Sequence, residues 1–204
     1  MANADTPFGL KPVRHLNGNP WNGKARVYYK AAGVAAVFVG DPVELLGSAD
    51  STGKYPTVQS LVTDDTPTHI VGVAVAVSNT PYIGANASDL SARYILAASE
   101  AYIFVCDDPS VIFEIQEDGV TSTLTADDVG CNCGLTNATG STTTGISAQE
   151  LESELGATIN TRALRLLRLV DREDNALGAY AKWEVLINLH AYNNAKHEDP
   201  TVGV

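Results

Sequence analysis

Short runs of β-branched, aromatic and small apolar residues recur along the chain, and clusters of polar turn residues separate them. The strand-like runs are residues 25–30, 34–46, 69–77 and 93–116. A Gly-Asp-Pro break at 40–42 divides the second run, and the Asp107-Asp108-Pro109 turn is one of the breaks in the fourth. Gly72, within the third run, allows close approach of a neighbouring backbone. Such closely spaced short strands predict a mainly β fold, a small β-barrel or sandwich with few short helices.

The C-terminal part of the chain predicts two antiparallel strands within 162–190, joined across 171–178. Alternation of apolar and polar positions from Trp183 to Leu189 is typical of a half-buried strand. The first of the two is ambiguous, because Arg162, Arg165 and Arg168 are three residues apart, which is also a helical spacing. A helix therefore remains the alternative for that segment.

Between the strand-rich parts, residues 119–160 are rich in Thr, Gly and Asn and predict a long polar loop inserted in the domain. A short helix is expected at 147–155, with Ser147 as its N-cap and Glu150 as the capping-box partner. We therefore expect an extended N-terminal arm over 1–24, a single β-rich domain over 25–190 and a C-terminal tail over 191–204.

Composition supports a folded and acidic protein. Of 204 residues 45% are hydrophobic, enough for a real core, and the formal net charge is −11. This charge argues against nucleic acid as the main partner, because phosphate binding requires a basic surface. The charge is uneven, however: residues 1–40 hold five bases and only one acid, Asp5. A basic arm on an acidic body could dock on a second copy or on another acidic surface.

The sequence carries no targeting signal of a recognisable kind. Its start lacks the apolar stretch of a secretory signal, and its longest apolar runs are too short to cross a bilayer. We therefore expect a protein made and kept in a cytoplasm, with no membrane partner. The odd number of cysteines, Cys106, Cys131 and Cys133, fits reduced thiols in that compartment.

Candidate catalytic and ligand-binding motifs are weak. The stretch from Gly47 to Gly53 encloses five residues rather than the four of a phosphate loop, and Tyr55 replaces the metal-binding Ser or Thr. Cys131-Asn-Cys133 lacks a second pair of ligands at zinc-site spacing. The acidic doublets, among them Asp107-Asp108, fall where turns are expected and lack calcium-loop spacing. We accordingly expect no enzyme activity, no cofactor and no metal.

Two long stretches resemble a known family. MANADTPFGLKPVRHLNGNPWNG, followed by YYK and FVGDPVEL, is similar to the opening of a family of tailed-bacteriophage head structural proteins. STTTGISAQELE and LRLLRLVDREDNALGAYAKWEVLINLH resemble the closing half of that family. The resemblance is strongest at the two ends and faint between about 50 and 130, and Cys-Asn-Cys departs from the shared pattern.

The resemblance implies a capsid decoration, or cement, protein that binds the outside of the shell and reinforces it. It further implies the major capsid protein as partner, self-association as a homotrimer, and a location on the virion exterior after assembly in the host cytoplasm. The expected contact residues are Lys11, Arg14, His15, Trp21 and Tyr28, of which the aromatic ones would supply apolar anchors.

Two other readings remain open from the sequence. The chain could serve another virion role, as a minor capsid, head-completion or tail component. It could instead be a glycan-binding β module on the virion, which would require a cleft lined with aromatics and carboxylates. Only 7% of the residues are aromatic, and Trp21 and Trp183 are far apart in sequence.

Overall fold

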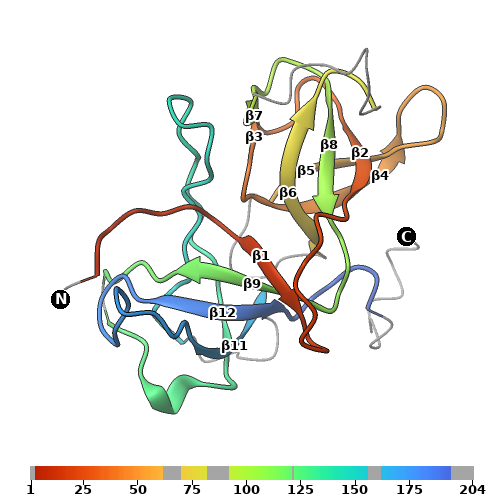
Figure 1. Ribbon diagram of the computed structural model, residues 1–204. Helices are drawn as coiled ribbons and strands as arrows, with labels where there is room; N and C mark the ends of the chain where they lie inside the picture. Colours follow the sequence, from red (N-terminus) through yellow and green to blue (C-terminus); the bar gives the residue numbers. More distant parts are fainter. Residues whose placement is uncertain (1–2, 62–69, 82–91, 121, 156–161, 194–204) are drawn as a thin grey trace.

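The computed structural model describes residues 3–61, 70–81, 92–120, 122–155 and 162–193. It confirms a mainly β fold, whose strands form a five-stranded sheet, a closed barrel and a small two-stranded sheet (Figure 1). The elements are β1 (Lys11–His15), β2 (Arg26–Lys30), β3 (Val37–Phe38), β4 (Pro42–Ala49), β5 (Pro56–Ser60), β6 (Ile70–Ser78), β7 (Tyr94–Ile95), β8 (Ala101–Cys106), β9 (Val111–Gln116), the 3-10 helix η1 (Ala126–Asp128), β10 (Asn132–Cys133), β11 (Leu164–Leu169) and β12 (Lys182–Ile187).

The first sheet is a closed barrel in the order β2-β5-β4-β6-β8. Its interior is filled by apolar side chains with essentially no exposure, among them Val43, Val58, Val71 and Ile103. The Gly-Asp-Pro break between β3 and β4 and the strand over most of 69–77 are confirmed. The predicted strands at 34–39 and 93–98 are shorter than expected, because β3 and β7 each span two residues and pair only with each other.

Gly72 has the role that the sequence suggested. A Cβ at this position would lie 2.8 Å from the Cα of Asp107 and would also collide with the carbonyl oxygen of Cys106. The absence of a side chain therefore lets β6 and β8 approach where the barrel closes.

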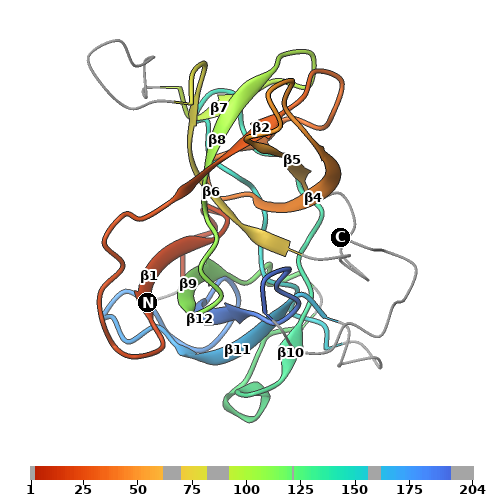
Figure 2. The ribbon, with the colours of Figure 1, turned by 90° about the vertical axis from the view of Figure 1, so that its right-hand side faces the viewer.

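The second sheet is open and antiparallel, in the order β1-β9-β12-β11-β10 (Figure 2). Its inner face carries Phe113, Trp183, Val185, Leu164 and Leu166, all buried. The same core cluster includes Leu61, Ile70, Val73 and Cys106 of the barrel part, so the sheet packs against the barrel, whose interior forms a second apolar cluster. The predicted turn after Cys106 leads the chain from β8 to β9.

The helix alternative for the segment after Arg162 is excluded over 164–169, which forms strand β11. Leu164 and Leu166 point to the core, while Arg165 is exposed. The spacing of Arg165 and Arg168 is explained by a β-bulge, because the register with β12 shifts between Leu166 and Arg168. One extra residue thus returns Arg168 to the same face as Arg165.

The polar segment 119–160 is packed against the sheet over its described parts. The predicted helix at 147–155 is wrong, since this segment is extended. Its backbone bonds to other extended segments instead: Leu151 N donates to Gln116 O at 2.8 Å, and Ser147 N donates to Val39 O at 2.9 Å. Leu151 is fully buried, so tertiary contacts outweigh the local capping signal.

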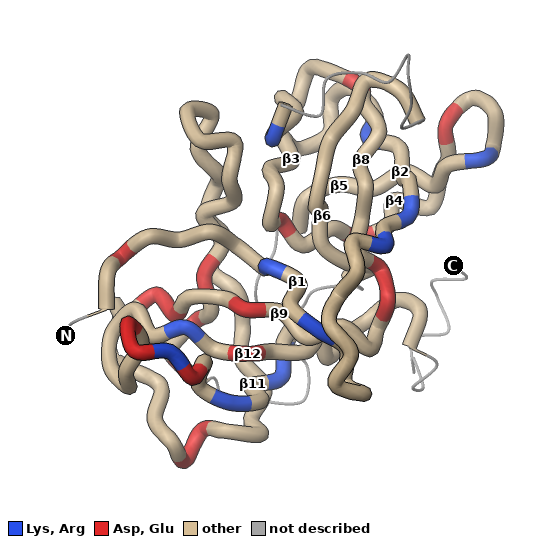
Figure 3. The backbone as a smooth tube through the Cα atoms, in the orientation of Figure 1, with Lys and Arg blue, Asp and Glu red and all other residues tan. Residues whose placement is uncertain are grey.

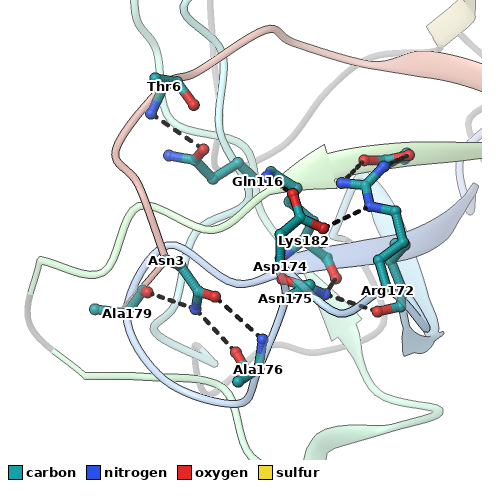
Figure 4. Close-up of polar contacts among 11 residues, drawn as sticks. Asn3, Thr6, Gln116, Arg172, Asp174, Asn175, Ala176, Ala179 and Lys182 are labelled. Atoms are coloured by element: carbon teal, nitrogen blue, oxygen red, sulfur yellow. Dashed lines mark hydrogen bonds and ion pairs between the residues drawn. The ribbon is translucent and has the colours of Figure 1, made fainter. Parts of the chain in front are cut away.

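The N-terminal segment, expected to extend as an arm over 1–24, is instead tied to the sheet from Asn3 to His15. β1 pairs with β9, and Leu10 is buried in the core. Asn3 donates from Nδ2 to Ala176 O at 2.8 Å and to Ala179 O at 3.0 Å, and its Oδ1 accepts from Ala176 N (Figure 4). These contacts dock the start of the chain on the loop between β11 and β12.

Candidate contact face

The outer face of the five-stranded sheet carries most of its charged strand residues. Residues directly opposite each other on paired strands share a face, and Lys11, Glu114, Glu184 and Arg168 lie in one such row. Arg14 and Arg165 lie in the next row, and Lys182 lies beyond Glu184 along β12. We call this set, Lys11, Arg14, Glu114, Arg165, Arg168, Lys182 and Glu184, the cationic face.

The cationic face differs in charge from the rest of the protein. It holds five bases and two acids, a net charge of +3, within a chain whose net charge is −11. Figure 3 shows basic segments on β1, β11 and β12 of this sheet. A local excess of cations on an acidic protein attracts an acidic partner surface and orients its approach.

Both acids of the cationic face are buried beneath arginines. Glu184 accepts from Arg168 at 2.8 Å and 3.0 Å, and Arg14 also binds its carboxylate. Burial alone would raise the pKa of Glu184, but the hydrogen bonds from Arg168 and Arg14 outweigh it and hold the pKa below its ordinary value. Glu114 is 7% exposed and pairs with Arg172 at 2.9 Å. The accessible part of the face is therefore cationic.

Two arginines present their guanidinium groups to solvent. The side chain of Arg168 is 56% exposed, and Arg165 is exposed while its Nε donates to Asn132 Oδ1 at 3.0 Å. Because one or two N–H groups of each are used to fix its orientation, the remaining donors can bind a carboxylate of a partner. Preorganised arginines lose little conformational entropy on binding.

The loop between β11 and β12 forms an acidic rim at one side of this face. Arg172 pairs with Asp174 at 3.3 Å, and Lys182 lies 3.8 Å from the same carboxylate (Figure 4). Asp171 and Glu173 are exposed in this loop. The cationic character is thus strongest toward β1 and β11, away from the loop.

Of the expected contact residues, the structure brings two together on the cationic face, Lys11 and Arg14. His15 pairs instead with Asp108 at 3.4 Å and lies 3.3 Å from the hydroxyl of Ser110. Trp21 packs partly buried against the core cluster, and its Nε1 donates to Lys24 O at 3.3 Å. His15 and Trp21 are therefore not part of the cationic face.

Tyr28 is a correction to the expected contacts, because it is 2% exposed inside the barrel. Its hydroxyl donates to Asp107 Oδ2 at 2.6 Å and lies 3.0 Å from the hydroxyl of Tyr192. Burial and the hydrogen bond to Asp107 raise the pKa of Tyr28, so it remains a neutral donor. Asp107 also pairs with Arg26 at 2.5 Å. This cluster joins the barrel to the C-terminal segment and is structural.

Sequence reasoning missed Arg165, Arg168 and Lys182 as surface residues. Their signal was present in β11 and β12, where bases alternate with buried apolar residues. Alternation along regular strands places Arg165 and Lys182 on the solvent side. The bulge after Leu166, however, decides that Arg168 joins them, and it has no clear sequence signature.

The other candidate motifs lie in structural elements of the fold. Residues 47–49 end β4, and residues 50–55 connect it to β5, where Asp50 Oδ1 accepts from the backbone N–H groups of Lys54 and Tyr55. All three cysteines are free. Within the described ranges, no group of three or more His, Cys, Asp or Glu side chains could hold a metal ion. Asp64-Asp65 lies outside the described residues.

No described helix has both the length and the apolar character that a membrane span requires. No protein-family model, curated protein or solved structure matches the chain.

Proposed function

We propose that this protein is a non-enzymatic virion protein of a tailed bacteriophage that binds the outer surface of the capsid shell and stabilises it. The proposal rests on the resemblance of both ends of the chain to phage head structural proteins. Its partners are the major capsid protein and further copies of itself, as a homotrimer. The protein assembles onto the shell in the host cytoplasm and remains on the virion exterior.

The single observation that supports this face as the contact surface is its net charge of +3 in a protein whose net charge is −11. Exposed arginines held by neighbouring acceptors are suited to carboxylates on an acidic shell surface. The remaining acidic surface keeps decorated particles apart by mutual repulsion. We propose that the cationic face points toward the shell.

Reinforcement of a shell requires a stiff body that links several weak contacts. The five-stranded sheet packs against the barrel through an apolar cluster to which both contribute, and such a close-packed body is stiff enough to transmit load between contacts. In a homotrimer, binding of one subunit makes the contacts of the other two effectively intramolecular. This chemistry needs no catalytic group.

The experiment is a titration of the purified protein against empty, expanded shells of the cognate capsid. We expect saturation at a fixed ratio to the shell protein and weaker binding at higher salt, since exposed charges are screened. Expanded shells should also resist heat better when saturated. A matched titration with duplex DNA and with a glycan array should give no comparable binding.

Failure to saturate the shells, together with binding to glycans alone, would reject the proposal. Electron microscopy of the intact particle separates a cement protein from another virion component. A cement protein is found in many copies across the shell surface, whereas a head-completion or tail component occupies few positions.

A further inference from the structure

A small cavity lies between the barrel and the segment 137–149, away from the cationic face. Its volume is about 90 Å³, and its described walls combine apolar side chains with five polar ones, those of Asp41, Ser60, Asn137, Thr139 and Gln149. About three water molecules would fill this volume. The apolar part of the wall includes Ala35, Ala36 and Phe38.

Asp41 is the one acid among the described residues that line this cavity. It is 2% exposed, and its Oδ2 accepts from Phe38 N at 2.9 Å and from Ser60 Oγ at 3.1 Å. Its second oxygen, Oδ1, has no hydrogen-bond partner in the described part of the chain. Burial outweighs the hydrogen bonds to the carboxylate and raises the pKa of Asp41 to about 6, so the carboxylate is charged at neutral pH.

Gln149 supplies the second acceptor. Its backbone N donates to Ser147 Oγ at 3.1 Å, and the residue is 3% exposed. Oε1 of Gln149 likewise has no hydrogen-bond partner among the described residues. Two residues that line one cavity thus each have a buried oxygen without a hydrogen-bond donor, which suits a donor-bearing ligand, because each oxygen remains desolvated until it is bound.

The chemistry of the walls selects among such ligands. Water would supply donors but no positive charge to the Asp41 carboxylate. A hard divalent cation takes six or more oxygen ligands, usually with several carboxylates among them, and the described lining residues include a single carboxylate, Asp41. A primary ammonium group on a short alkyl stem supplies three donors and a charge, and its stem fits the apolar walls.

We propose that this cavity, the Asp41 pocket, binds a primary alkylammonium group, with the ammonium on Asp41 and Gln149 and the alkyl stem against Ala36 and Phe38. The chemistry is shared by a free alkylamine and by a lysine side chain of another protein. The site lies outside the cationic face, so it is independent of the proposed docking to the shell.

The test is a titration of the isotopically labelled full chain with ethylammonium chloride, monitored by amide chemical shifts at constant ionic strength. We expect saturable shifts at Phe38, Gly140 and Gln149. Sodium chloride and tetramethylammonium chloride are the controls, because neither offers an N–H donor. A lysine derivative blocked at its α-amino and carboxyl groups distinguishes the two sources: if it binds as well, the pocket accepts a lysine side chain.

Two variants make the test specific. Asp41→Asn should weaken ethylammonium binding at least tenfold, whereas Glu173→Gln, the same charge change on an exposed loop, should leave it unchanged. Ala36→Leu should block the cavity while Asp41 is retained, so the result does not depend on the folding of one variant. Shifts that rise linearly without saturation, equal shifts with tetramethylammonium, or wild-type affinity in Asp41→Asn and Ala36→Leu would overturn the proposal.

Discussion

Arg14 on β1 reaches across β9 to bind the carboxylate of Glu184 on β12, although the two residues are 170 positions apart in sequence. The start of the chain is therefore fixed to its last strand by a side-chain contact as well as by the backbone pairing of β1 with β9. The same carboxylate binds Arg168 from the other side. One buried acid thus orients two arginines of the cationic face.

Replacing Glu184 by Gln should destabilise the protein by about 1–3 kcal/mol, because two guanidinium groups lose a charge-assisted acceptor. Urea unfolding at pH 7 measures this difference. Since the pKa of Glu184 is lowered in the folded protein, its contribution is present above the unfolded pKa and is lost as the pH falls through the folded value. Glu173→Gln, on an exposed loop, is the control, and equal stability of both variants would contradict the role assigned to Glu184.

Deletion of residues 1–24 should destabilise the whole domain by more than about 3 kcal/mol, because it exposes the edge of β9 and removes buried Leu10. Thermal unfolding and hydrogen exchange at the β9 amides report this loss. Lys24→Ala, in the same segment but beyond β1, should have little effect. A deletion variant that melts like the full chain would show that β1 contributes nothing to stability.

Tyr28→Phe should cost about 1–2 kcal/mol, because the buried hydroxyl no longer donates to Asp107. Tyr29→Phe is the matched control, since the Tyr29 hydroxyl donates to Glu100 at 2.6 Å in an exposed position and should contribute less than about 0.5 kcal/mol. Denaturant midpoints of the two variants provide the comparison. Equal effects would argue against the structural role of the Tyr28 cluster.

Glu117 should make the protein less stable as the pH rises. Burial outweighs the hydrogen bonds from Trp183 Nε1 and Leu124 N and raises the pKa of Glu117 to about 7. Between the ordinary pKa of a glutamate and about 7, the folded protein keeps a proton on Glu117 that the unfolded chain has released. The stability of the protein therefore falls as the pH rises, until the pH passes about 7. Between pH 5 and 8 the loss due to this group is on the order of 2 kcal/mol.

Comparison with Glu117→Gln isolates this effect from other titrating groups. Burial lowers the pKa of His190 to about 4, so below the unfolded pKa of this histidine its contribution to stability rises with pH. Burial also raises the pKa of Glu150 to about 7, so Glu150 acts in the same direction as Glu117. Both groups are present in the variant as well, so the difference between the two stability curves reports Glu117. A difference that does not change with pH would refute the assignment.

Arg165→Glu should weaken shell binding at least tenfold if the cationic face docks on the capsid, because it reverses an exposed charge on the β11 side of that face. Lys54→Glu makes the same charge change on the connection between β4 and β5 and should alter binding less than twofold. Circular dichroism checks that both variants are folded. Equal shell affinities of the two variants would show that the contact lies on another surface.

Much of the fold could be predicted from local pattern. The strands β6, β8, β9 and β12 were expected because β-branched and aromatic residues alternate or cluster within them and turn residues bound them. β1 was missed, since its sequence, Lys-Pro-Val-Arg-His, has little apolar character and becomes a strand through pairing with β9. The helix predicted after Ser147 failed because Leu151 has a buried position between two extended segments.

The candidate surface was only partly predictable for a related reason. Lys11 and Arg14 were expected from the charge excess of residues 1–40, which is a property of composition. Tyr28 was placed wrongly as a contact, because an aromatic residue beside a basic segment has the same sequence signal whether it faces solvent or a barrel interior.

The sequence by itself determined a β-rich chain, its main turns and its excess of acid, because these depend on residue type and on neighbours close in the chain. Only the tertiary structure decided that bases near positions 11–14 and 165–182 share one face, and that Asp41 and Gln149 line one cavity. Strand order, register and bulges set such neighbourhoods, and they follow from the burial of a common core by segments distant in sequence.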